Sequence, residues 1–256
     1  MGSSASLLAS GARRMHFHLP KPLHGWREFA GEVAIIVLGV LIALSAESAV
    51  QSMEWRQKVG AAVADMNNEL RSGDGPEAYE RLAVHDCVAS RLERLRASVE
   101  RGDRAASRKL IDQFWLPNRT WDSLARDAAN TADVAAHMPH EQMLEYRIAY
   151  EMVPDMQRLA EKELADLGHL RGLPASGGLL ATDEKHSTID AIEALKIDND
   201  TFARESTFVL LRLRMMNLGL TRAFVEHHVR AAYAHYGACV TAPRLQATSS
   251  MHTVVD

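Results

Sequence analysis

The chain has 256 residues, which suits one domain or two small ones. Its formal net charge is −4, so the chain as a whole lacks the basic excess that nucleic-acid binding requires. Aromatic residues make up only 6% of the chain, and strong helix formers dominate. Strand-like segments, in which apolar and polar residues alternate and β-branched residues are frequent, are nearly absent. We therefore expect an all-α protein that does not bind nucleic acid.

The most informative segment is an apolar run near the N-terminus. The 14 residues from Val33 to Ala46 carry no charge, and Ser45 supplies their only hydroxyl group. At 1.5 Å per residue this run covers about 21 Å, whereas a membrane core of about 30 Å takes roughly 20 residues, so flanking residues must add length. We expect a membrane-spanning helix over residues 27–50, preceded by a tail over residues 1–26.

Two other interpretations of this run stay open. Small residues at Ala46 and Ser48 permit cleavage of a signal peptide, although more than 30 residues precede the run, which is unusual for such a peptide. A run of this length also occurs in buried helices of soluble proteins. The spanning helix is the preferred interpretation.

The charges around the run predict its orientation. Residues 13–32 contain four Lys or Arg residues, and residues 47–66 contain two. Because positive charge is retained on the cytoplasmic side, we expect the N-terminus in the cytoplasm and the main domain in the periplasm.

Three residues of the expected spanning helix are candidates for a role. Glu32 lies at its edge, where an acid is either a costly functional group or a solvated residue paired with Arg27. Gly39 and Ala43 form a pair of small residues four positions apart, which permits close packing of two helices in a membrane.

The segment from Gly31 to Arg56 also carries a recognisable pattern. It consists of Gly31-Glu32, then Gly39 with Leu41-Ile42-Ala43-Leu44, then Trp55-Arg56. This pattern resembles a family of uncharacterised bacterial single-pass membrane proteins. The resemblance implies a protein anchored in the inner (cytoplasmic) membrane with an extracytoplasmic helical domain, and it brings no activity with it.

The helical domain is expected over residues 51–240. The spanning helix is predicted to continue without a break and to stop near Ser72, because Gly73-Asp74-Gly75-Pro76 combines strong helix breakers. Further helices are expected over residues 77–101, 105–115, two short stretches within 120–138, 139–171 with a kink at Pro154, 187–197 and 200–236. The residues predicted to form the core of the last helix are Phe208, Leu211, Met215, Leu218, Phe224, Val225 and Val229. Residues 241–256 are predicted to be a disordered tail.

The two cysteines, Cys87 and Cys239, allow two interpretations. In an oxidising compartment they form one disulfide between the second helix and the end of the last; otherwise they are two buried thiols. His228 and His235 share a helix face close to Cys239, but their spacing matches no established metal motif, and we expect no metal site.

No motif in the sequence names a reaction. Nucleophile elbows, phosphate loops and dinucleotide fingerprints are missing, so we assign no catalytic residue and no cofactor. The favoured hypothesis is a membrane-anchored interaction or sensory-type domain that contacts the lipid bilayer and binds itself or another envelope protein. The alternatives are an envelope enzyme with a site between helices, or a small oligomeric channel with Glu32 near its mouth. A cluster of perturbed acids or histidines in a deep pocket would favour the enzyme, and a flat apolar patch would favour the interaction domain.

Overall fold

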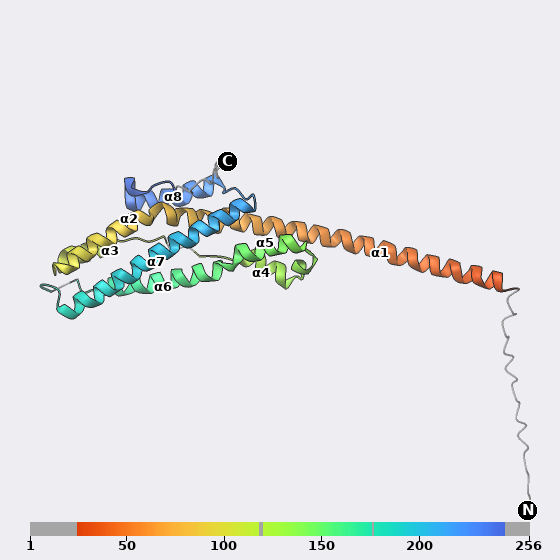
Figure 1. Cartoon of the computed structure of the whole chain (residues 1–256), viewed down its shortest axis with the longest axis horizontal. Helices are drawn as coiled ribbons and strands as arrows, with labels where there is room; N and C mark the ends of the chain where they lie inside the picture. Colours follow the sequence, from red (N-terminus) through yellow and green to blue (C-terminus); the bar gives the residue numbers. More distant parts are fainter. Residues whose placement is uncertain (1–24, 118–119, 176, 244–256) are drawn as a thin grey trace, which may run out of the picture. The chain divides into compact units, whose positions relative to one another are not determined.

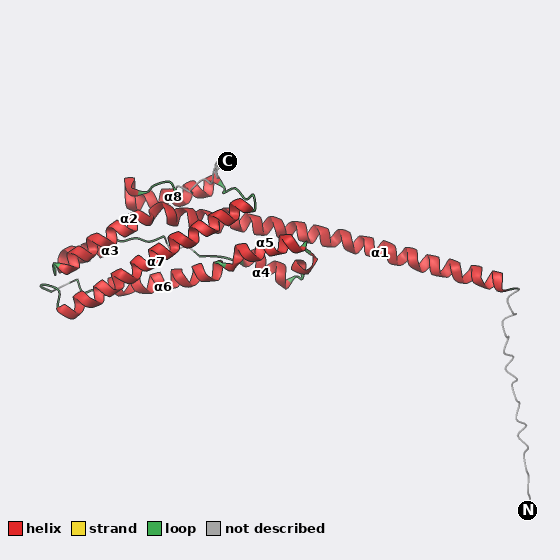
Figure 2. Ribbon diagram, viewed as in Figure 1, coloured by secondary structure: helices red, strands yellow, loops and turns green. Residues whose placement is uncertain are grey.

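The computed structural model describes residues 25–117, 120–175 and 177–243. Within these ranges all regular elements are helices and none is a strand, which confirms the predicted all-α class (Figure 2). The chain divides into two units, Met1–Met53 and Glu54–Asp256. The tail expected over residues 1–26 and the disordered tail expected over residues 241–256 lie largely outside the described residues.

Helix α1, Trp26–Glu69, contains the apolar run. An 18-residue window of the helical segment that starts at Trp26 has a mean hydropathy of 2.4, and none of that window is buried. By length and composition α1 can therefore cross a membrane. Its apolar side chains are exposed over the whole run, for example Ile35 and Ile36.

The predicted helix stop near Ser72 is wrong. The chain continues from α1 through one turn of π-helix, η1 (Leu70–Asp74), directly into α2 (Gly75–Glu100). The Gly75 amide donates to the Leu70 carbonyl, five residues back, and Pro76 occupies the first turn of α2, where proline is tolerated. The glycine and proline residues therefore widen one helical turn instead of ending the helix.

This wide turn leaves one backbone carbonyl without its helical partner. In the π-helical pattern, the Arg71 carbonyl would accept a hydrogen bond from the amide of residue 76, but proline has no N–H. The Thr221 amide from the segment between α7 and α8 donates to this carbonyl instead, at 3.3 Å. The Arg71 side chain reinforces the contact, because its Nε donates to the Gly219 carbonyl at 2.8 Å.

Helix α7 packs along both α2 and α6 (Figure 1). Helices α3 and α8 pack on α2, and α5 contacts α6 and α7. The bounds are α3 Arg104–Asp112, α4 Leu124–Thr131, η2 Val134–His137, α5 His140–Glu151, α6 Val153–Arg171, α7 Thr182–Met215, α8 Arg222–Tyr236 and η3 Gly237–Cys239. The expected kink at Pro154 is a full break between α5 and α6, because proline at the second position of α6 starts a new helix.

Two predicted boundaries around α7 are also wrong. The expected short helix ending at Ile197 and the first part of the expected last helix are one helix, α7, which starts at Thr182. That last helix is in turn broken after Met215, where Asn217 adopts a left-handed conformation with φ of 54°. The Leu218 amide donates to the Leu213 carbonyl and Asn217 to Arg214, the pattern of a Schellman motif with asparagine in the usual glycine position.

The helical domain has two apolar cores separated by a polar layer. One core collects residues of α2, α3, α8 and the adjacent ends of α6 and α7, and includes Cys87. The other collects the end of α1, α5 and the opposite ends of α6 and α7. Between them Arg81 of α2 donates to both carboxylate oxygens of Glu163 of α6, at 3.0 and 2.7 Å, and its guanidinium lies 3.9 Å from the centre of the Phe202 ring of α7.

A disulfide joins Cys87 of α2 to Cys239 of η3, with the Cα atoms 5.6 Å apart. Of the two interpretations of the cysteines, the structure therefore has the bonded one. The bond closes a loop of 152 residues, which stabilises the fold by about 5 kcal/mol in the chain-entropy model. Around it the Thr241 amide donates to the Ala83 carbonyl, so backbone contacts also hold the C-terminal segment on α2.

The π-helical turn generates a prediction about Gly75. A Cβ atom added at this position would lie 2.4 Å from Leu220 Cδ2 and 2.8 Å from Leu213 Cδ1. We expect Gly75→Ala to lower the free energy of unfolding by about 1–3 kcal/mol, because the segment between α7 and α8 has to move away from the turn. Chemical denaturation of the full chain measures this.

The matched control is Gly168→Ala in α6, where an added Cβ meets no atom within 4 Å. We expect this variant to be more stable than the wild type by about 0.5–1 kcal/mol, because alanine restricts the unfolded chain. A Gly75→Ala variant as stable as the wild type would contradict the described packing.

Candidate functional site

The main candidate site is an exposed apolar groove on the helical domain. Three apolar residues of α7, Phe208, Leu211 and Met215, are 57%, 48% and 62% exposed. Together with Ile148 of α5 and Met152, which follows α5, they line a groove with a volume of about 400 Å³. Large apolar side chains gathered on one surface are the usual mark of an interaction site.

The groove corrects the prediction that Phe208, Leu211 and Met215 are core residues. The C-terminal half of α7 is apolar on two faces, and the face that packs into the domain carries Val209, Leu210 and Leu213. The spacings of three and four between the exposed residues fit a helix stripe equally well. Periodicity alone does not show which of the two apolar stripes faces the core.

The rim of the groove is predominantly acidic. Glu151, Asp155 and Glu205 line it together with Arg212. Asp155 is ion-paired with the exposed Arg158 on the same helix. Arg212 donates to the Glu145 carbonyl at 3.3 Å, and its Nε atom has no hydrogen-bond partner among the described residues. The rim therefore carries both signs of charge around an apolar floor.

The candidate residues of the apolar helix lie exposed on α1. Glu32, Gly39 and Ala43 are all on the surface of the described chain, and a Cβ at Gly39 would meet no atom within 4 Å. No contact of the structure tests the proposed roles of these three residues. Their roles remain predictions from the sequence.

Three histidines of the helical domain, His85, His228 and His235, have separate environments. His85 contacts Asp86 and Asp200 at 3.0 Å each, whereas the His235 ring stacks on Trp115 with ring centres 4.4 Å apart. His228 Nδ1 lies 2.7 Å from the Phe224 carbonyl oxygen one turn earlier in α8. In residues 25–117, 120–175 and 177–243 no three His, Cys, Asp or Glu side chains gather in a way that could hold a metal ion.

The π-helical turn contains a buried acid, Asp74, which no sequence pattern marks. Asp74 is 2% exposed, and its Oδ1 accepts a long hydrogen bond of 3.4 Å from the Asp122 amide. Its Oδ2 has no hydrogen-bond partner among the described residues. Burial raises the pKa of Asp74 to about 8, and the nearby carboxyl groups of Glu69 and Asp122 contribute in the same direction. The carboxyl group is therefore mostly protonated at pH 7.

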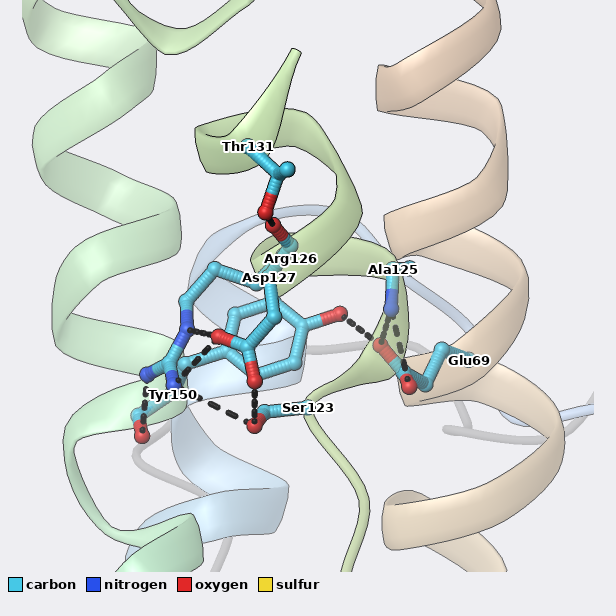
Figure 3. A network of polar contacts seen from close by, with 7 residues as sticks. All are labelled: Glu69, Ser123, Ala125, Arg126, Asp127, Thr131 and Tyr150. Carbon is cyan, nitrogen blue, oxygen red and sulfur yellow. Dashed lines mark hydrogen bonds and ion pairs between the residues drawn. The ribbon is translucent and has the colours of Figure 1, made fainter. Parts of the chain in front are cut away.

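A polar network beside Asp74 joins α1, α4 and α5 (Figure 3). Glu69 accepts hydrogen bonds from the Ala125 amide, at 3.0 and 3.2 Å, and so caps the first turn of α4. The Tyr150 hydroxyl donates to the same carboxylate at 2.7 Å, and burial raises the pKa of Tyr150 well above its usual range. Arg126 contacts Asp127 and lies over the Tyr150 ring. The contacts of Glu69 and Arg126 connect the first turn of α4 to α1 and α5.

Comparisons with known proteins supply no relative from which a function could be transferred. No family model, no curated protein and no solved structure matches the chain.

The apolar groove and the buried acid are separate features of the domain. Asp74, whose pKa burial raises to about 8, lines neither the groove nor the smaller pocket beside α4. The residues that are exposed together on the domain are apolar ones, on α7 and α5. The arrangement is suited to binding an apolar surface, and the buried acid is suited to setting the stability of the π-helical turn.

The raised pKa of Asp74 makes a prediction about pH. The fold favours the neutral form of Asp74. Its contribution to stability is therefore fully present below pH 3.8, the ordinary pKa of an aspartate, and is lost as the pH rises to about 8. We expect the free energy of unfolding of Asp74→Asn to equal that of the wild type near pH 4. Between pH 4 and pH 8 the variant should gain stability over the wild type by up to about 1.4 kcal/mol per pH unit. Denaturation of both proteins at a series of pH values measures the difference.

Asp190→Asn, at an exposed position of α7, controls for the removal of one carboxyl group. A stability difference between Asp74→Asn and the wild type that stays constant across this pH range would contradict the assignment.

Proposed function

We propose that the chain is a membrane-anchored helical module of the bacterial envelope that associates with a second copy of itself. In this proposal α1 spans the inner membrane, the N-terminal tail is cytoplasmic and the helical domain is periplasmic. The observation that carries the proposal is the exposed apolar stripe of α7, because a soluble surface of this kind is usually covered by a partner.

The membrane anchor is supported by the exposure of α1. A buried helix of a soluble protein would be covered by its own domain, whereas none of the apolar window is buried here. The side chains of Ile35, Leu38 and Ile42 are exposed, and moving them from water into lipid is favourable because it removes apolar surface from water. The resemblance of residues 31–56 to single-pass bacterial proteins points the same way.

The proposed periplasmic location rests on two features. The excess of Lys and Arg before the apolar run favours a cytoplasmic N-terminus. The disulfide between Cys87 and Cys239 suits an oxidising compartment, where such bonds form and persist.

A second copy is the proposed occupant because both exposed apolar surfaces suit a symmetric pair. Two copies anchored in one membrane have the same orientation. A two-fold axis along the membrane normal then places the same residues of the two copies against each other. The spacing of Phe208, Leu211 and Met215 is that of helices that pack along each other, and the shared membrane makes this pairing parallel. Gly39 and Ala43 allow a close approach of two copies of α1 within the membrane.

The self-association is tested with the full chain in lipid nanodiscs or mild detergent, by measuring the mass of the particle at several protein concentrations. We expect a dimer in the wild type. Leu211→Glu should raise the dissociation constant at least about tenfold, because a charge replaces a leucine buried in both copies. In membranes, Leu211→Cys should give a covalently linked dimer after mild oxidation.

Ile197 provides the matched control, because it is 64% exposed on the same helix but does not line the groove. Ile197→Glu should leave the mass unchanged, and Ile197→Cys should not cross-link. A wild type that stays monomeric at micromolar concentration, or a dimer that is unaffected by Leu211→Glu, would contradict a self-association through α7. A monomer would assign the groove to a different protein.

A further inference from the structure

A second, smaller pocket lies where α4, η2 and α5 meet the end of α1. It has a volume of about 220 Å³ and is separate from the groove on α7. Its floor includes three methionines, Met66, Met138 and Met143, together with the Tyr146 ring. Methionine side chains adapt to ligands of different shape, so this floor suits an apolar body.

Two polar groups beside the floor, the Tyr146 hydroxyl and the Met66 carbonyl, form hydrogen bonds with other residues of the protein. Met66 and Tyr146 are buried, and the Tyr146 hydroxyl donates to Asn67 Oδ1 at 2.5 Å. The Met66 carbonyl accepts from the Tyr150 hydroxyl, which is part of the network in Figure 3. These two polar groups are therefore already paired. An apolar ligand that covers the floor does not leave them without a hydrogen-bond partner, which would be costly.

The charged groups of the pocket are both positive. Arg126 and Arg147 line it, and no aspartate or glutamate does. Arg126 is already ion-paired with Asp127 at 3.0 Å. Arg147 is exposed and makes no hydrogen bond or ion pair with any described residue. One guanidinium is thus available at an apolar pocket, and guanidinium groups recognise carboxylates by paired hydrogen bonds.

We propose that this pocket binds a small apolar carboxylate, with its apolar body between the methionines and its anionic group on Arg147. An apolar cavity of about 150 Å³ accommodates benzene, so about 220 Å³ suits one ring or a short alkyl chain that carries a carboxylate. This inference rests on the pocket alone and is independent of the proposed self-association.

The probe is 3-phenylpropionate, with the neutral 3-phenylpropan-1-ol as its uncharged counterpart. Binding is measured by ligand-detected NMR on the full chain in lipid nanodiscs, and empty nanodiscs correct for partitioning into lipid. For a ligand of about eleven heavy atoms we expect a dissociation constant on the order of 1 mM. The carboxylate should bind about fivefold more tightly than the alcohol, the gain expected of one exposed ion pair.

Three variants separate the features of the pocket. Arg147→Gln should remove the preference for the carboxylate and leave binding of the alcohol unchanged. Arg94→Gln is the matched control, because Arg94 is an exposed arginine of α2 without a described partner, and the preference should persist. Ala135→Phe should block both ligands by filling the pocket, which Ala135 lines.

Circular dichroism shows which variants are folded, and the exposed Arg147 variant decides the question if Ala135→Phe does not fold. The absence of saturable binding of 3-phenylpropionate by the folded wild type would overturn the proposal. An unchanged preference in Arg147→Gln would overturn it as well.

Discussion

The ion pair between Arg81 of α2 and Glu163 of α6 is the contact on which the helical domain depends. Both side chains are almost fully buried, at 5% and 3% exposure, and two hydrogen bonds connect them. Burial raises the pKa of Glu163, and the guanidinium opposes that effect by stabilising the charged form. A charge at this depth persists only with its partner, so the ion pair fixes how α2 and α6 are placed relative to each other on either side of α7.

The same polar layer places α7 and separates the two apolar cores. On α7, Asp198 accepts hydrogen bonds from Lys162 at 2.8 Å, and Asn199 donates to the His85 carbonyl of α2 at 3.1 Å. Because these contacts hold α7 at the polar layer, the C-terminal half of α7 can bury only one of its two apolar stripes. The exposed stripe with Phe208, Leu211 and Met215 is therefore a consequence of the register as well as the proposed contact between copies.

Sequence periodicity predicted the all-α class and most of the helices, because amphipathic stripes and breaker residues are local signals. It failed at Gly73–Pro76, where the Thr221 amide, distant in sequence, satisfies the carbonyl that proline leaves open. It also failed at Asn217, whose left-handed conformation ends α7 without glycine or proline. The groove and the buried Asp74 were not predictable, because both depend on which helix faces the residue in question.

The most direct test of this account is a double-mutant cycle on the buried ion pair. We expect Arg81→Met and Glu163→Leu each to lower the free energy of unfolding by about 3–5 kcal/mol, because each variant leaves one buried charge without its partner. The double variant should be more stable than either single variant, since it leaves neither charge behind. Single variants that cost less than about 1 kcal/mol, or a double variant whose cost equals the sum of the two, would contradict a fold organised around this contact.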